Sequence, residues 1–179
     1  MSDQKTIEIS GEQNGLRFLI EKFSGLKEVP SLPDICGWLA AAEITEEEIR
    51  PYRQFNSEKY ARNKIFRNDF VELLILAWLP GQITLIHDHN GSHGVVRIFE
   101  GEITETKYQF DKEEKIRISS AQIVPAGMLA GVGEPDIHHL GNDATNKENA
   151  ISIHVYAPPL KGMNIYEVGS GESWLYQPD

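Results

Sequence analysis

The stretch HDHNGSHGVVRIFEGEITETKYQF, residues 87–110, decides the fold class of this chain. Residues 93–100 and 102–110 are rich in Val, Ile, Phe, Thr and Tyr, the residue types that favour β-strands. The pair Glu100-Gly101 between them predicts a tight hairpin turn. The stretch therefore predicts two neighbouring strands that follow a histidine-rich segment.

The same pattern continues through the chain from about residue 60. Short segments of strand-forming residues alternate with Gly, Asn, Asp and Pro, and the segment 142–149 reads as a polar loop. Many strands without intervening helices predict a closed barrel or jelly roll, which also removes exposed sheet edges. The strands are expected at 60–66, 70–79, 82–88, 93–100, 102–110, 114–118, 121–124, 128–132, 136–141, 150–157 and 164–168.

Helices are predicted before residue 60, over 14–26, 31–42 and 44–55. The apolar residues of the first segment recur at helical spacing and form one amphipathic face. Thr45 and Glu48 have the form of a capping box, and Pro51 is expected to end or kink the third helix. We therefore expect one domain, 1–179, with a helical part over about 10–57 and a β-barrel over about 60–170.

Composition restricts the class of partner. The 179 residues carry a formal net charge of -10, which argues against nucleic acid or an anionic membrane surface and favours a small-molecule ligand. Cys36 is the only cysteine, and the N-terminal residues have no apolar signal segment. We expect a cytoplasmic protein that acts as a monomer.

The histidines are the strongest chemical signal. On a strand, His87 and His89 would share one face while Asp88 points away, so two imidazoles could bind one Fe, Zn, Cu or Ni ion. A pair of surface histidines is the simpler alternative. The third ligand is open among four residues, His93, His138, His139 and His154.

The segment AISIHVYAPP adds a polar face to this pattern. Ser152, His154 and Tyr156 alternate with three apolar residues and would share one side of the strand. If that side faces a barrel interior, it lines a pocket with hydrogen-bonding groups. The alternative is the solvated face of an ordinary sheet.

These residues resemble the cupin superfamily. In GQITLIHDHNGSHGVVRIFEG the first cupin motif is matched by Gly81, His87, His89 and Gly101, with Gly94 at the position that is usually glutamate. HHLGN resembles the end of the second motif, with His138 as its histidine, and PAG at 125–127 resembles its beginning, although the gap between the two is long.

Within the cupins, the missing glutamate together with YARN at 60–63, HDHNGSH and SIHVYAPP looks like cysteine dioxygenase, a thiol dioxygenase. The resemblance covers about residues 60–160. It implies a mainly β cupin jelly-roll barrel, or double-stranded β-helix, with N-terminal helices packed against it. It also implies iron(II) held by His87, His89 and His138, with L-cysteine and O2 as substrates and cysteine sulfinate as the product.

The resemblance assigns the other site residues as well. Arg62 would bind the substrate carboxylate through its guanidinium fork, with Tyr60 adding a hydroxyl. A solvated surface arginine is the alternative for Arg62. Tyr156, His154 and Ser152 would form a catalytic relay beside the iron, and the family implies a cis bond before Pro158.

Gly94 has a particular meaning in this family. Animal members carry a cysteine at this position that becomes joined to the active-site tyrosine, so the sequence predicts an uncrosslinked Tyr156. Cys36 does not match the family position. Three rivals remain: a 3-mercaptopropionate dioxygenase, which generally has glutamine in place of Arg62; a metal cupin isomerase, which usually keeps the glutamate that Gly94 replaces; and a small-ligand-binding cupin.

Overall fold

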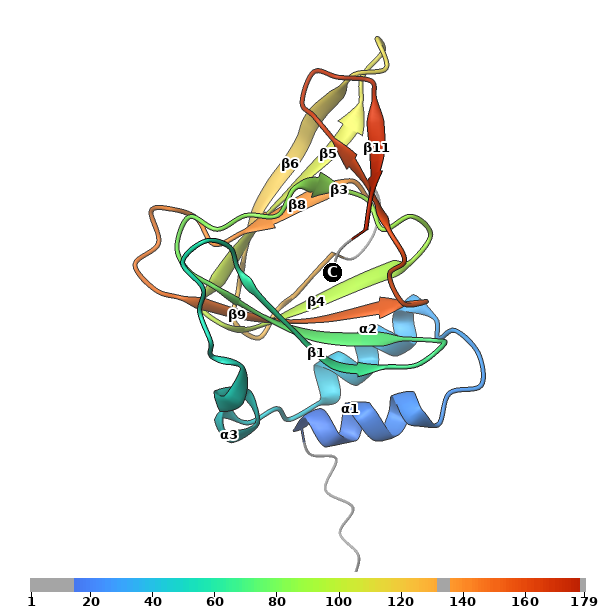
Figure 1. Cartoon of the computed structure of the whole chain (residues 1–179), viewed down its shortest axis with the longest axis vertical. Helices are drawn as coiled ribbons and strands as arrows, with labels where there is room; N and C mark the ends of the chain where they lie inside the picture. The colour runs from blue at the N-terminus through green and yellow to red at the C-terminus, as the bar shows by residue number, and fades with distance from the viewer. Residues whose placement is uncertain (1–14, 132–135, 178–179) are drawn as a thin grey trace, which may run out of the picture.

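The computed structural model describes residues 15–131 and 136–177, which form two antiparallel sheets lying face to face, with helices on one side (Figure 1). The first sheet has the strand order β1-β2-β9-β4-β7 and the second β11-β10-β3-β8-β5-β6. The predicted jelly-roll barrel with N-terminal helices is confirmed. The strands are β1 (Ala61–Arg67), β2 (Glu72–Trp78), β3 (Ile86–His87), β4 (His93–Glu100), β5 (Glu102–Phe110), β6 (Ile116–Pro125), β7 (Leu129–Ala130), β8 (His138–Gly141), β9 (Ala150–Ala157), β10 (Met163–Tyr166) and β11 (Ser173–Tyr176).

Alternation along β2 and β9 divides the core into two layers. On β2, Leu74 and Leu76 point between the two sheets, whereas Leu73 and Ile75 point toward the helices. All seven residues of β2 and all eight of β9 are buried. A strand buried on both faces reads as a nearly continuous apolar run, so a polar residue on its inner face is conspicuous.

The N-terminal helices cover the outer face of the first sheet (Figure 1). Ser31 caps the second helix by accepting from the Asp34 N–H, and the predicted capping box of Thr45 and Glu48 is present. Arg97 of β4 donates to the Leu39 and Ala42 carbonyls and so ties the end of the second helix to the sheet. The helices are α1 (Gly15–Ser24), α2 (Leu32–Ala41) and α3 (Glu46–Ile49), and a short 3-10 helix, η1 (Arg50–Tyr52), follows at Pro51.

The predicted hairpin at Glu100-Gly101 is wrong. β4 pairs with β7 and β9, whereas β5 pairs with β6 and β8, so the turn carries the chain from one sheet to the other. Gly101 has φ +70, and a Cβ there would lie 2.6 Å from the Asn149 carbonyl oxygen. Glycine is therefore required at this position. A corner between two sheets can need such a residue just as a hairpin turn does.

Several strand boundaries also differ from the expectation. The expected strand 82–88 is regular only over β3, because its earlier residues make single backbone contacts with Leu140 and Gly141. The segments 114–118 and 121–124 form one strand, β6, whose pairing with β5 contains a bulge. β11 was not predicted. Residues 10–14 of the expected helical part and residue 132 lie outside the described residues.

Candidate metal centre

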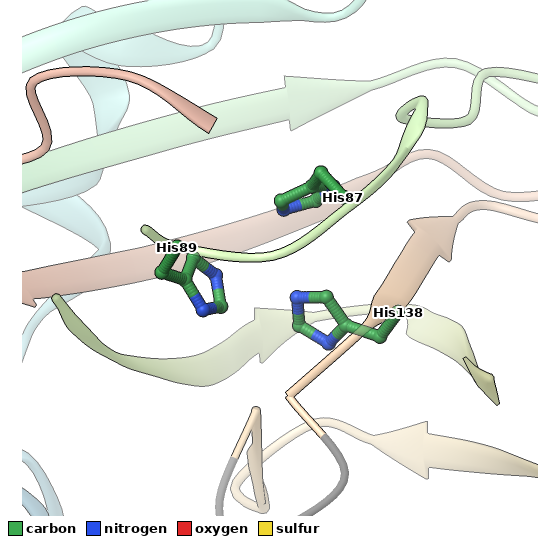
Figure 2. Close-up of side chains that lie close together, drawn as sticks. All are labelled: His87, His89 and His138. Atoms are coloured by element: carbon green, nitrogen blue, oxygen red, sulfur yellow. The ribbon is translucent and has the colours of Figure 1, made fainter. Parts of the chain in front are cut away.

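Three buried histidines converge between the two sheets (Figure 2). His87 ends β3, His89 follows it by two residues, and His138 begins β8 directly across from His87. One potential ligand atom from each lies within 4.8 Å of the other two, and the ring centroids are 4.9 to 5.3 Å apart. This is the arrangement of three nitrogen donors around a common point.

The hydrogen bonds of the three rings determine which nitrogen faces that point. The Nδ1 atom of His87 lies 2.8 Å from the Leu85 carbonyl oxygen, an acceptor only, so Nδ1 carries the proton. The Nδ1 atoms of His89 and His138 lie 2.7 and 2.9 Å from carboxylate oxygens of Asp136 and Glu105. Each ring therefore presents the lone pair of Nε2 to the centre.

The residues present fit a metal ion. Nε2 of His138 is buried and has no hydrogen-bond partner among the described residues, which is costly unless an electrophile takes it. Burial lowers the pKa of His87 well below its ordinary value, and it also lowers the pKa of His138. Both rings are therefore neutral at pH 7, the form that binds metals.

Asp88 anchors the segment between His87 and His89 through hydrogen bonds on the side away from the centre. Its side chain points away from the centre, as predicted, and accepts hydrogen bonds from the Asn164 N–H at 3.1 Å and the Tyr166 hydroxyl at 2.7 Å. Both partners belong to β10, which also pairs with β3. Asp88 thus fixes the chain direction between the two histidines, and this explains why His89 stays in place after β3 has ended.

A cavity of about 590 Å³ opens beside the three histidines, a volume in the usual range of small-molecule sites. Tyr60, Arg62, His87, His154 and Tyr156 contribute polar groups to its lining. Most of the remaining lining is apolar, including Leu74, Leu76, Leu140, Leu160 and Met163. The structure therefore brings every candidate site residue except Ser152, His89 and His138 to the wall of one pocket. The rings of His89 and His138 contact that of His87, and Ser152 hydrogen-bonds to His154, so these three contact the lining residues.

Ser152, His154 and Tyr156 form a directional chain of hydrogen bonds with Trp78. The Trp78 indole can only donate, and its Nε1 donates to Ser152 Oγ at 2.8 Å. The Ser152 hydroxyl is thereby free to donate its own proton to His154 Nε2, 2.7 Å away. His154 Nδ1 then carries a proton and donates to the Tyr156 hydroxyl at 3.3 Å. The phenol proton of Tyr156 is left to point into the pocket.

The pKa values agree with a neutral relay. Burial lowers the pKa of His154 to about 3, and the nearby Arg62 guanidinium adds to the effect. Burial also raises the pKa of Tyr156 above its ordinary value of 10. Both groups keep their protons fixed over the whole physiological range, so Tyr156 acts as a hydrogen-bond donor in this structure.

Arg62 lies in the pocket rather than on the surface, with 22% of its side chain exposed. One Nη atom is 3.8 Å from the carboxylate of Glu72, a buried residue that also contacts Arg67 at 3.3 Å. The Tyr60 ring stacks on Trp78 at a centroid distance of 4.4 Å, which directs it along the pocket wall. Arg62 is therefore a partly buried residue of the pocket lining.

The other residues that the sequence singled out fall outside the centre. His93 is exposed, and His139 faces the other side of β8, where its Nδ1 contacts the Tyr108 hydroxyl at 2.8 Å. Cys36 lies in α2 outside the barrel. A Cβ at Gly94 would lie 3.1 Å from Tyr156 Cε1, so this position does adjoin the tyrosine ring. The bond before Pro158 is cis.

Four contributors were missed by sequence reasoning: Trp78, Glu72, Glu105 and Asp136. Glu72 had a signal, because it is a charge on the inner face of a strand that is otherwise apolar on that face, whereas Glu105 shares its face of β5 with Lys107 and Gln109 and does not stand out. Trp78 and Asp136 had none, since their roles depend on partners about 50 or more residues away in the chain. None of the described helices is long and apolar enough to cross a bilayer.

Comparisons with known proteins agree with this geometry. A family model described as cysteine dioxygenase type I matches residues 22–168. Cysteine dioxygenase type 1 of Rattus norvegicus is 27% identical over 159 residues, which cover 87% of this chain and 78% of the rat protein, and the protein of Homo sapiens is 25% identical over the same shares.

Solved structures support the fold. The TT1209 protein of Thermus thermophilus has a TM-score of 0.51 at 24% identity, covering 62% of this chain and 93% of its own. A conserved protein with a double-stranded beta-helix domain from Klebsiella pneumoniae has a TM-score of 0.55 at 18% identity, covering 69% and 96%. The barrel is therefore a double-stranded β-helix.

Proposed function

The chain belongs to the cysteine dioxygenase type I family and is a thiol dioxygenase, and from that premise we propose that it oxidises the thiol of L-cysteine to cysteine sulfinate with O2. His87, His89 and His138 would hold the metal, which we propose is iron(II). The observation that carries the proposal is the set of three buried imidazoles that turn Nε2 toward one point beside a pocket containing a guanidinium.

The metal supplies the redox chemistry that brings the substrate sulfur and O2 together. The reaction balances without a further reductant, because the sulfur atom gives up every electron that O2 accepts and both oxygen atoms end on sulfur. Neutral imidazole ligands suit an anionic thiolate, since the metal charge is not already met by a carboxylate in direct contact. The protein residues bind, orient and shield the substrate.

Arg62 is the residue that we propose binds the substrate carboxylate. Its guanidinium lies in the pocket wall, and its planar fork can donate two charge-assisted hydrogen bonds to one carboxylate. Glu72 on one side restricts the guanidinium to that wall, and the Tyr60 hydroxyl adds a donor beside it. This arrangement favours an amino-acid thiol over cysteamine, which lacks the carboxylate.

Tyr156 is the residue that we propose contacts the reacting atoms. The chain Trp78, Ser152, His154, Tyr156 directs each proton one way, so the phenol is held as a donor toward the bound substrates. Because His154 stays neutral and Tyr156 stays protonated, this donor does not change with pH near neutrality. The apolar lining of the pocket keeps bulk water away from the thiolate.

Two less direct expectations belong to the same proposal. We infer that the chain works in the cytoplasm and as a monomer, consistent with one cysteine placed outside the barrel and an acidic surface that keeps copies apart. The single-domain organisation over 1–179 stays a prediction.

The experiment is anaerobic loading with iron(II), followed by O2 uptake with L-cysteine, 3-mercaptopropionate and cysteamine in parallel. We expect one iron per chain in the native protein and loss of iron in His87→Ala, His89→Ala and His138→Ala. L-Cysteine should give the highest kcat/KM. A preference for 3-mercaptopropionate would replace the proposed substrate, and retained iron in the three variants would refute the ligand set.

A further inference from the structure

Glu105 is a carboxylate buried behind the metal centre. It lies on β5 with its side chain between the two sheets, on the same face as Ile103, and is 1% exposed. Its Oε1 accepts from His138 Nδ1 at 2.9 Å and from the Gly131 N–H at 3.0 Å. Its Oε2 accepts from Gln122 Nε2 at 2.7 Å. The carboxylate is therefore aimed at one metal-binding histidine and held there from both oxygens.

Burial of this charge is not explained by packing. Removing a carboxylate from water costs several kcal/mol unless charge and hydrogen bonds compensate it. The three donors to Glu105 are all formally neutral groups, and Lys107, two residues along the strand, supplies the nearby positive charge. A leucine or glutamine would fill the same space at a lower desolvation cost. A buried carboxylate is therefore best explained by a positive charge on the far side of His138.

The three ligands differ in what supports them. His87 donates to a backbone carbonyl, which is a neutral acceptor. His89 donates to Asp136, whose side chain is 38% exposed and therefore partly screened by water. Only His138 is supported by a carboxylate that water does not reach. The negative charge that the imidazole ligands do not provide is thus supplied by the carboxylates that contact them. The most buried of these carboxylates is Glu105, behind His138.

We propose that Glu105 is a positioning residue of the metal centre. Its negative charge fixes the proton of His138 on Nδ1, holds the ring in its orientation and makes Nε2 a stronger donor, so that part of the metal charge is compensated before substrate binds. The inference rests on the proposed metal site. It adds that the affinity of this site depends on a residue that touches neither metal nor substrate.

Glu105→Gln tests the charge with almost no change of shape. The amide oxygen can still accept from His138 and Gly131, and Gln122 can turn its own amide to meet the new NH2 group. We expect iron(II) and cobalt(II) affinity, measured by anaerobic competition with a chelator, to fall about 10- to 100-fold. The free energy of unfolding of the metal-free protein, measured with urea, should stay equal or rise, because a buried charge has been removed.

Gln122→Ala is the matched control. It removes one donor to Oε2 and leaves the carboxylate in contact with His138 Nδ1 and the Gly131 N–H, so metal affinity should change by less than about threefold, well below the loss expected when the charge itself is removed. If Glu105→Gln does not fold, the charge-exchanged variant Glu105→Gln with Gln122→Glu keeps the pair isosteric and puts the carboxylate out of contact with His138. It should fold and still bind metal weakly.

The outcomes separate this inference from the proposed function. Equal metal affinity in folded Glu105→Gln and the native protein would overturn the role of Glu105 and leave the three-histidine site standing. Recovery of native affinity in the charge-exchanged variant would also overturn it, because the position of the charge would then not matter. Absence of metal binding by the native protein would instead refute the proposed function.

Discussion

Gly94→Ala should damage the metal centre although it adds a single carbon atom. A Cβ at this position would lie 2.8 Å from both Cε1 and Nε2 of His89 and 3.1 Å from Cε1 of Tyr156. Carbon atoms in contact prefer a separation of about 3.5–4.0 Å, so the His89 ring would have to move by about 0.7 Å or more. Asp136 holds the other side of that ring at 2.7 Å, and the movement is therefore opposed.

The expected magnitude follows from these distances. Metal and catalytic sites require positions within about 0.5 Å of the productive geometry, so we expect metal affinity to fall at least about tenfold. Overpacking should lower the free energy of unfolding by about 1–3 kcal/mol. Gly94 does not have a left-handed φ, so backbone strain contributes nothing to either loss. The assays are anaerobic chelator competition for metal affinity and urea denaturation for stability.

Gly37→Ala in α2 is the matched control. No heavy atom lies within 4 Å of the Cβ that it adds, and alanine in a helix is favoured over glycine by about 0.5–1 kcal/mol. Metal affinity should stay at the native value in this variant. Native metal affinity in Gly94→Ala would refute the reasoning, because it would mean that the His89 ring is not confined by the position of Gly94.

Three further predictions follow from the pocket and the relay. Arg62→Ala should lower kcat/KM for L-cysteine by about 10- to 100-fold, the size of a charge-assisted contact, and leave kcat/KM for cysteamine nearly unchanged. Parallel O2-uptake assays check this prediction. Equal losses for the two thiols would mean that Arg62 does not bind the carboxylate. Trp78→Phe should lower kcat with little change in metal content, because Ser152 loses the donor that sets the direction of the relay, and unchanged kcat would argue against a fixed direction. The pKa of His154 is about 3 in the fold and about 6.5 in the unfolded chain, so the unfolded state binds more protons between these values. As pH drops below 6.5, His154 alone should lower the free energy of unfolding by about 1.4 kcal/mol per pH unit, in addition to the effects of His87 and His138. His154→Gln should have a shallower slope in urea denaturation at pH 4 to 6.5, and an unchanged slope would assign the effect to other groups.

The strands that could be predicted are those whose own residues indicate both the strand and its ends. Residues 93–100, 102–110 and 150–157 form strands with the predicted boundaries, since each is a strand-forming run that ends at turn residues or a proline. β11 could not be found in this way. Its four residues are all exposed, and only pairing with β10 holds them extended. The Glu100-Gly101 turn was placed correctly and assigned wrongly, because a glycine does not show which sheet the next strand joins.

The site residues also differ in whether the local sequence predicts them. His87 and His89 are predictable from the period of a strand, and Ser152, His154 and Tyr156 from alternation along β9. The choice of His138 over His139 and the place of Arg62 needed the family resemblance, and the geometry now puts both in the site region. Glu105 and Asp136 required the fold, since a carboxylate that supports a histidine from another strand has no fixed spacing in sequence.

The most direct test of the whole account is the mass of the product formed from L-cysteine under isotopically heavy O2 by the iron(II)-loaded protein. We expect cysteine sulfinate with heavy oxygen at both sulfinate positions, formed without any added reductant. Disulfide as the only product, or a sulfinate that carries ordinary oxygen from water, would contradict the proposed dioxygenation.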